Sequence, residues 1–160
     1  MRMDKSEFEK TVLDYSDMLL RCAYSICSNR SDAEDIVQET FVKLIKKNPK
    51  FRDEEHKKAW LLRVVINLSK DFVKSFWNRN KEHLEDFEEL IGSDAIIDND
   101  DEIWSLVDKL PIKYKIVIQL YYHEGLTIKE ISSAIGKSVG TTSNRLNRAR
   151  DLLKKMYEEE

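Results

Sequence analysis

Apolar residues near the start of the chain recur three or four positions apart, which is the period of an α-helix. The first run follows Ser6-x-x-Glu9, the pattern of a capping box, and predicts a helix that ends near Ser28. The second run follows Ser31-x-x-Glu34, which has the same pattern, and predicts a helix that stops before the next proline. The chain is therefore expected to open with two capped, amphipathic helices.

A third apolar run is longer than the first two. Lys50 to Glu55 are expected to form a charged loop, and the helical period then resumes from Ala59 to about Asn78. The three helices can bury one common core.

The last third of the chain carries the signals of two short helices. The first covers 103–110. Pro111, whose fixed φ suits the first turn of a helix, opens the second, which is expected to stop near Gly125.

Two more helices follow, and each begins with a cap signal. Thr127-x-x-Glu130 is a third capping box, and Gly136 comes after that helix at a position that favours positive φ. Ser138 is expected to cap a last helix that reaches about Met156.

The segment 80–101 lacks a sustained apolar period and contains loop-like Gly, Ser, Asp and Asn clusters. Residues 82–102 hold ten acidic and no basic residues, whereas 1–81 has a net charge of +4 and 103–160 a net charge of +3. The overall charge of −3 therefore comes from an acidic strap between two mildly basic blocks. A connector with a binding role and a loop that only supplies length fit this pattern equally well.

The composition favours an all-α protein, because the 160 residues include only four Gly and two Pro. We expect two small helical domains, 1–80 and 103–160, joined by a flexible acidic linker at 81–102. No stretch approaches the roughly 20 apolar residues that span a bilayer. A cytoplasmic protein without membrane insertion is therefore expected.

The clearest sign of a binding function is a helix-turn-helix pattern over 126–153, where a short capped helix and a glycine turn precede an arginine-rich helix. At 100° per residue, one side of the last helix should face the core, with Val139, Thr142, Leu146, Ala149 and Leu153. The opposite side carries Thr141, Asn144, Arg145 and Arg148. Asn can pair with adenine, and Arg with guanine or phosphate, so this side suits a DNA major groove.

The long helix over 59–78 and the residues just before it interleave basic and aromatic side chains. Cations neutralise phosphates and aromatic rings stack on unpaired bases, which suits single-stranded DNA. Helical spacing alone favours a core position for most of the aromatic residues. The residues concerned are Lys57, Lys58, Arg63, Lys70, Lys74, Arg79, Trp60, Phe72, Phe76 and Trp77.

The second predicted helix carries an acidic stripe. Asp32, Asp35 and Glu39 stand at i, i+3 and i+7, with Gln38 beside them. Acidic residues near a helix N-terminus favour the helix dipole, which explains the first turn but not Gln38 and Glu39. A basic protein surface is the partner that this stripe suits.

Two other interpretations fit parts of the sequence less well. An ordinary helix-turn-helix regulator, with an N-terminal half that dimerises or binds a ligand, would bind duplex DNA tightly by itself. An enzyme is disfavoured because the three histidines are scattered and no Gly-rich phosphate loop is present. Cys22 and Cys27 lie about 140° apart around a helix, so inert thiols are expected rather than a disulfide or a metal pair. Neither a metal nor a cofactor is expected.

Three segments resemble, in order, the motifs of bacterial RNA polymerase sigma factors. Residues 32–41 are similar to the polymerase-docking segment, 60–67 with Asp71 to the promoter-melting helix, and 125–150 to the terminal helix-turn-helix. The layout of two blocks without a further domain is similar to the extracytoplasmic-function (ECF) group. The resemblance implies a three- to four-helix bundle followed by a four-helix helix-turn-helix domain.

The resemblance also implies a function, which is promoter-specific transcription initiation without catalysis. Docking on the clamp coiled coil of the β′ subunit of core RNA polymerase would use Asp32, Asp35, Gln38 and Glu39, and the β flap would be a further contact. The −10 element would meet Lys57, Lys58, Trp60, Arg63, Asn67, Lys70, Asp71 and Lys74. The −35 element would meet Thr141, Ser143, Asn144, Arg145, Asn147 and Arg148.

Further implications concern promoter melting and regulation. The segment Arg52 to Lys58 would capture a flipped base, and the acidic linker would run toward the RNA exit path. An anti-sigma factor, free or membrane-anchored, would cover the docking stripe. The family often has Lys or Arg where this chain has Ser143, and His or an aromatic residue in place of Asn147. The resemblance therefore leaves the promoter sequence open.

Overall fold

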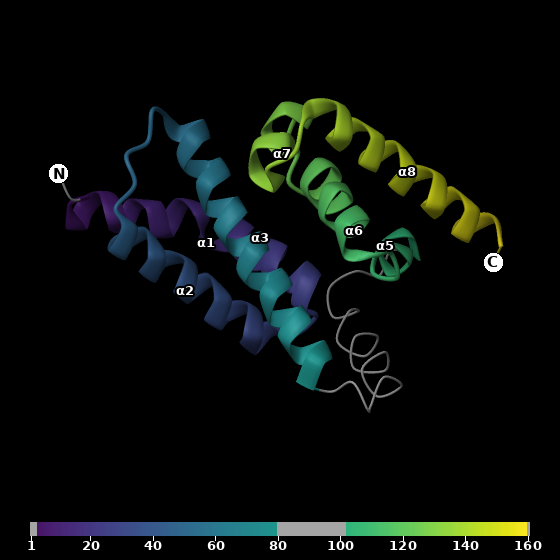
Figure 1. Cartoon of the computed structure of the whole chain (residues 1–160), viewed down its shortest axis with the longest axis horizontal. Coiled ribbons are helices and arrows are strands. Elements are labelled where there is room, and N and C mark those ends of the chain that lie inside the picture. Colours follow the sequence, from purple (N-terminus) through teal and green to yellow (C-terminus); the bar gives the residue numbers. More distant parts are fainter. Residues whose placement is uncertain (1–2, 80–101, 160) are drawn as a thin grey trace.

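The computed structural model describes residues 3–79 and 102–159, so the expected linker at 81–102 lies almost wholly outside the described residues (Figure 1). The first block contains α1 (Lys5–Cys27), α2 (Arg30–Lys47) and α3 (Glu54–Arg79). The second contains α5 (Glu102–Val107), α6 (Ile112–Ile118), the π-helical turn η2 (Gln119–His123), α7 (Ile128–Ile135) and α8 (Val139–Glu158). Every element of the described residues is helical, which confirms the all-α prediction.

The first two helices begin earlier than their expected capping boxes. The Asp4 side chain caps α1 by accepting from the backbone NH of Glu7 at 2.8 Å. Asn29 caps α2 by accepting from the backbone NH of Asp32 at 3.0 Å. The predicted caps at Ser6 and Ser31 are therefore wrong by two residues, because Asp and Asn are equally good N-caps and stand ahead of them.

Helix α3 also begins before its predicted start at Ala59. The Asp53 side chain accepts from the backbone NH of His56 at 2.8 Å, and Glu54 and Glu55 occupy the first turn, where negative charge is favourable. The expected loop from Lys50 to Glu55 is therefore shorter. The segment 54–58, expected to lie in a base-capturing loop, is helical.

The helix-turn-helix has the predicted caps. Thr127 and Glu130 form the complete capping box of α7, and Gly136 ends the helix at φ 69°. The Ser138 hydroxyl caps α8 by accepting from the backbone NH of Thr141 at 3.1 Å. These residues therefore fix where α7 ends and where α8 begins.

The N-terminal bundle and the C-terminal module are packed together. Helix α7 lies along α3, and α6 lies against α1, so one continuous apolar core runs through both (Figure 1). Thr142, Leu146 and Ala149 fix α8 in this core. Val139, predicted to face inward with them, is instead 52% exposed because it stands in the first turn of α8, beyond the edge of the core.

Candidate nucleic-acid interface

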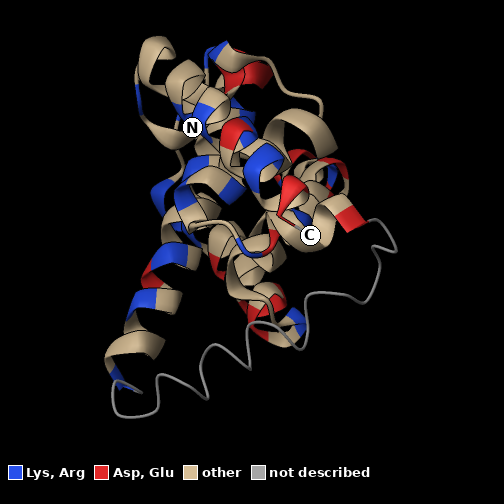
Figure 2. Cartoon of the chain, turned by 90° about the vertical axis from the view of Figure 1, so that its right-hand side faces the viewer, with Lys and Arg blue, Asp and Glu red and all other residues tan. Residues whose placement is uncertain are grey.

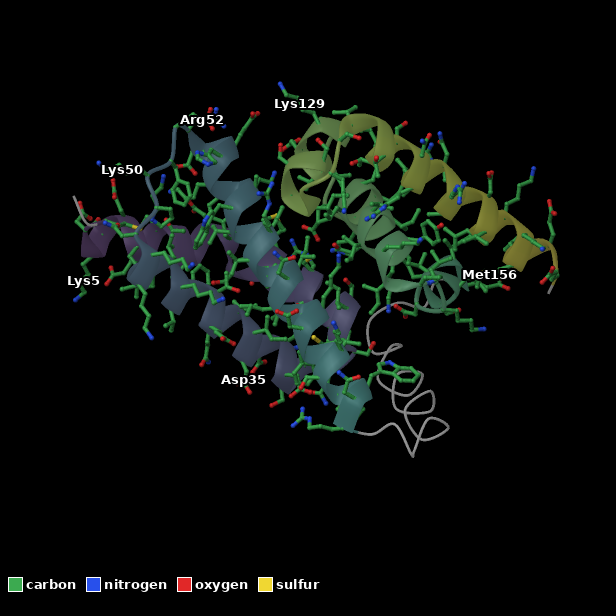
Figure 3. The ribbon with its side chains drawn as sticks, viewed as in Figure 1. Lys5, Asp35, Lys50, Arg52, Lys129 and Met156 are labelled. Carbon is green, nitrogen blue, oxygen red and sulfur yellow. The ribbon has the colours of Figure 1, made fainter. Side chains whose placement is uncertain are left out.

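The acidic stripe of α2 faces outward. Asp35, Gln38 and Glu39 are exposed, and Asp35 points away from the bundle (Figure 3). Asp32 is half-buried, and burial, with a smaller effect of the nearby Asp35 carboxylate, raises its pKa. Helix α2 packs mainly on α1 and α3, so the C-terminal module leaves the stripe uncovered.

Helix α3 gathers five of the eight residues predicted for the −10 element along one side. Arg63, Asn67, Asp71 and Lys74 are exposed at i, i+4, i+8 and i+11, a spacing that keeps them on one stripe. Lys70 is half-buried beside them. Lys and Arg recur down the exposed end of this helix (Figure 2).

Lys70 also faces the C-terminal module. Burial lowers its pKa, and the positive charges of Arg145 and Lys137 lower it further. The cationic sides of α3 and of the helix-turn-helix therefore lie near each other. A polyanion would relieve this repulsion.

The remaining three predicted residues, Lys57, Lys58 and Trp60, contact other side chains of the protein. The Lys57 ammonium donates to the Thr11 hydroxyl at 3.3 Å and pairs with Glu54 at 3.1 Å, so it lies off the Arg63 stripe. Trp60 is half-buried, with its ring edge-on to Phe51 at 5.8 Å between centroids.

The polar side of α8 forms a groove of about 470 Å³. Five of the six residues predicted for the −35 element line it, together with Lys113, Tyr114 and Asp151. Ser143 is half-buried and is not among the lining residues. The predicted residues in the groove are Thr141, Asn144, Arg145, Asn147 and Arg148.

Arg150 positions this groove, although it was not predicted as a site residue. Its Nε donates to the Tyr122 hydroxyl at 2.6 Å, and its guanidinium lies 5.4 Å from the Tyr121 ring. Its Nη1 donates to Asn147 Oδ1 at 3.2 Å and so orients that side chain. The two tyrosines lie 28 and 29 residues earlier in the chain, and no local spacing links them to Arg150.

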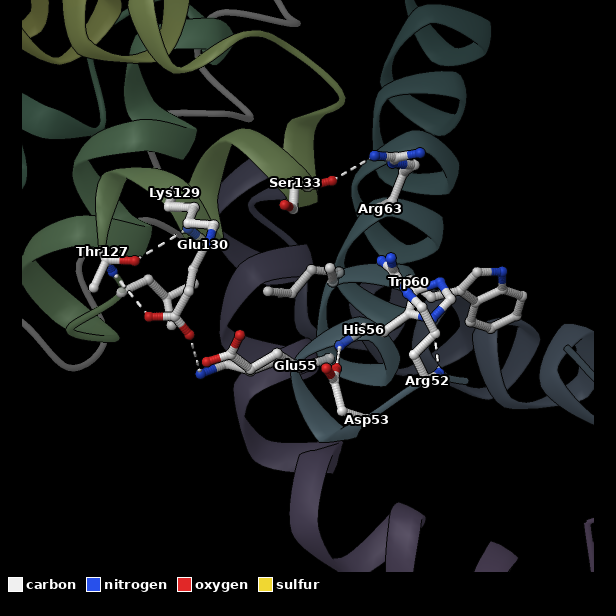
Figure 4. A pocket seen from close by; sticks show the side chains of 14 residues that line it. Arg52, Asp53, Glu55, His56, Trp60, Arg63, Thr127, Lys129, Glu130 and Ser133 are labelled. Carbon is white, nitrogen blue, oxygen red and sulfur yellow. Dashed lines mark hydrogen bonds and ion pairs between the residues drawn. The ribbon is translucent and has the colours of Figure 1, made fainter. Parts of the chain in front are cut away.

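A cleft of about 740 Å³ lies between α3 and α7 (Figure 4). Arg52, His56 and Trp60 line one wall, and Thr127 and Glu130 line the other. The His56 ring accepts from the backbone NH of Arg52 at 3.1 Å, which holds the loop before α3 against the helix. This cleft could not be predicted from local patterns, because each wall comes from a different block.

The cysteines are free thiols, as expected. Cys22 is fully buried and Cys27 partly buried, and burial raises the pKa of each to about 12. Both thiols therefore stay protonated at neutral pH. Across residues 3–79 and 102–159, no three side chains of the metal-binding types converge, and no helix is long and apolar enough to cross a membrane.

Two family models match the chain. Sigma-70 region 2 matches residues 11–79, and Sigma-70 region 4 matches residues 100–153. RNA polymerase sigma factor SigV of Bacillus subtilis is 29% identical over 157 residues, which cover 95% of each protein. The ECF RNA polymerase sigma factor SigE of Mycolicibacterium smegmatis is 28% identical over 158 residues, which cover 92% of this chain but only 60% of that relative.

Solved structures share the fold. CnrH, in complex with the cytosolic domain of CnrY, superposes with a TM-score of 0.72 at 24% identity over 98% of this chain and 91% of CnrH. RpoE of Bartonella quintana, in complex with the anti-sigma factor NepR, superposes with a TM-score of 0.69 at 23% identity over 95% of this chain and 97% of RpoE.

Proposed function

The chain belongs to the ECF group of sigma-70 RNA polymerase sigma factors, and from this premise we propose how its surfaces divide the work of promoter-specific transcription initiation. A sigma factor joins core RNA polymerase and directs initiation at promoters. The proposal rests mainly on one observation: the acidic stripe, the α3 stripe and the α8 groove are three separate polar surfaces on one continuous helical core.

We assign polymerase docking to the α2 stripe. Asp32, Asp35, Gln38 and Glu39 would meet the basic coiled coil of the β′ clamp. Exposed complementary charges steer encounter and fix the docking register. The C-terminal module would make the second contact, on the β flap.

We assign the −10 element to α3. Arg63, Lys70 and Lys74 would neutralise phosphates, while the Asn67 amide can hydrogen-bond a base edge. Asp71 shares the stripe and would accept from a base amino group. Unstacking a base costs a few kcal/mol, which a preformed pocket offsets.

The wall of the cleft between α3 and α7 that is formed by α3 and the loop before it would hold the flipped base. Trp60 lies in this wall, where its ring packs edge-on against Phe51, and Lys58 also lines the cleft. Because 54–58 is helical, capture would depend on residues 51–53 of the loop before α3 and on side chains of the first turns of α3, rather than on a long loop. Lys57, held by Thr11 and Glu54, would fix that turn against α1.

We assign the −35 element to the α8 groove. Asn144, Arg145 and Arg148 can reach base edges or phosphates, and Thr141, Ser143 and Asn147 complete the polar face. The protein would act as a specificity subunit without catalysis of its own, in the cytoplasm with the polymerase. An anti-sigma factor, free or membrane-anchored, is the expected inhibitor. Of the similar solved structures, one is a complex with the anti-sigma factor NepR and another is a complex with the cytosolic domain of CnrY.

Reconstituted transcription tests the function. Purified core RNA polymerase with the purified chain should start transcripts at a promoter of the source genome, and core polymerase alone should not. A promoter with its −35 and −10 elements scrambled is the matched control. Absence of a promoter-dependent transcript from every promoter of that genome would refute the assignment.

A further inference from the structure

Helix α7 covers part of the α3 surface that we assign to the −10 element. The Arg63 guanidinium donates to the backbone carbonyl of Ser133 at 2.5 Å (Figure 4). The Lys58 ammonium lies 3.3 Å from the Glu130 carboxylate, and both side chains are only 28% exposed. A DNA strand on α3 and helix α7 would therefore compete for the same two cations.

A stronger contact joins the two modules elsewhere. Arg21 of α1 and Glu124, just after η2, form a two-pronged ion pair with distances of 2.8 Å (Nε to Oε2) and 2.7 Å (Nη2 to Oε1). The Glu124 side chain is 5% exposed, and it also accepts from the Gln119 amide at 2.8 Å. Paired, charge-assisted hydrogen bonds of this kind are stronger and more directional than single ones.

We propose that the free chain is self-inhibited by this arrangement, with the Arg21–Glu124 pair as a latch that holds α7 over the −10 face of α3. The inference rests on the proposed role of α3. Neither latch residue belongs to the docking stripe, the α3 stripe or the α8 groove, so the latch can be changed without touching a proposed binding residue. The docking stripe on α2 stays open while the latch is closed, so polymerase docking would precede promoter reading.

The closed arrangement carries costs that make it reversible. Lys70 faces Arg145 and Lys137 across the junction, so like charges are held near one another. Lys115 of α6 is 3% exposed in the packed structure. Opening the modules would hydrate these cations, which lowers the free energy needed to separate them.

Zero-length cross-linking of the free, full-length chain tests the latch. A carbodiimide couples an amine to a carboxylate that touches it, so Lys58 should link to Glu130. The neighbouring pair Lys57 and Glu54, 3.1 Å apart on one helix, is an internal control that does not depend on module packing. Mass spectrometry should find both links in the wild-type chain.

Charge reversal then separates the latch from general packing. Arg21→Glu should lower the yield of the Lys58–Glu130 link about fivefold and leave the yield of the Lys57–Glu54 link unchanged. Adding Glu124→Arg to the same chain should restore the yield of the Lys58–Glu130 link. Arg21→Gln is the milder variant if Arg21→Glu fails to fold by circular dichroism. The proposal is overturned if the Lys58–Glu130 link is missing while the Lys57–Glu54 link forms. It is also overturned if these substitutions leave the yield of the Lys58–Glu130 link unchanged.

DNA binding supplies the functional readout. The free Arg21→Glu chain should bind a single-stranded −10 oligonucleotide about fivefold more tightly than wild type, and the charge-swapped chain should return to the wild-type affinity. Equal affinities for all three chains would refute self-inhibition. That result is distinct from failure of the proposed function, which would show as absent promoter-dependent transcription by wild-type chain with core polymerase.

Discussion

Helices α2 and α3 belong to one bundle but differ in what covers their polar faces. Helix α2 packs mainly on α1 and α3 and leaves Asp35, Gln38 and Glu39 exposed. Helix α3, with 26 residues, is long enough to pack in the bundle and also against α7. Its Arg63 and Lys58 side chains bind Ser133 and Glu130 of α7. Under the proposed assignment, docking on polymerase needs no rearrangement of the chain, whereas freeing Arg63 and Lys58 for the −10 element requires α7 to move.

The largest expected effect comes from reversing the charge of the open α2 stripe. Asp35→Arg with Glu39→Arg should weaken binding to core RNA polymerase about 100-fold, because like charges then meet the basic partner surface. Both side chains are exposed, so the fold should be kept. Binding is measured by fluorescence anisotropy of labelled sigma factor titrated with core polymerase.

The matched control reverses two exposed acidic residues on another helix. Asp14→Arg with Asp17→Arg makes the same change of net charge on α1. This variant should keep its affinity for polymerase within about twofold. An equal loss in both variants would mean that net charge, rather than the stripe, governs docking, and would remove α2 from the docking assignment.

The contrast between α2 and α3 could be predicted only in part from the sequence. The apolar period gave the helices, and the capping patterns at Thr127 and Ser138 gave the helix-turn-helix, because both are local signals. The exact helix starts could not be predicted, since Asp4 and Asn29 compete with the nearby serines as caps. Exposure of the acidic stripe also follows from local spacing.

The cover on α3 could not be predicted, because it depends on residues far apart in the chain. Arg63 meets Ser133 across 70 positions, and Arg21 meets Glu124 across 103. No periodic pattern links such pairs, and each side chain alone fits a solvated helix surface equally well. For the same reason, the hydrogen bond from Arg150 to Tyr122 could not be predicted from the sequence.

A smaller effect is expected at the α8 groove, which like the α2 stripe presents exposed polar groups. Arg148→Ala should weaken binding of the polymerase complex to its −35 duplex about tenfold. The slope of log affinity against log salt should fall by about one if Arg148 contacts a phosphate. Filter binding at several salt concentrations gives both numbers.

Lys154→Ala is the control for that experiment. Lys154 is an exposed cation on the same helix, and it is not among the residues that line the groove. Its removal should change affinity less than twofold. If both variants weaken binding equally, the groove has no special role and α8 contributes only general positive charge.

The smallest effect concerns the packing that keeps α3 covered. Lys115 lies in α6, which packs on α1, and burial lowers its pKa against the opposing effects of Asp108 and Cys27. Lys115→Met keeps a chain of similar length and removes the cost of burying a charge. The free energy of unfolding at neutral pH should therefore rise by about 1 kcal/mol. Urea denaturation followed by circular dichroism measures it.

The pH dependence of this gain tests its cause. Because the pKa of Lys115 is lower in the folded chain than in the unfolded one, the wild-type penalty is complete below the folded pKa and fades as the pH rises through it. The advantage of Lys115→Met should thus shrink as the pH rises from neutral toward the ordinary lysine pKa of about 10. Lys109→Met, at an exposed lysine, should show no such gain. If Lys115→Met instead destabilises the chain, the ammonium must contribute favourable contacts, and burial of Lys115 would strengthen the closed arrangement rather than oppose it.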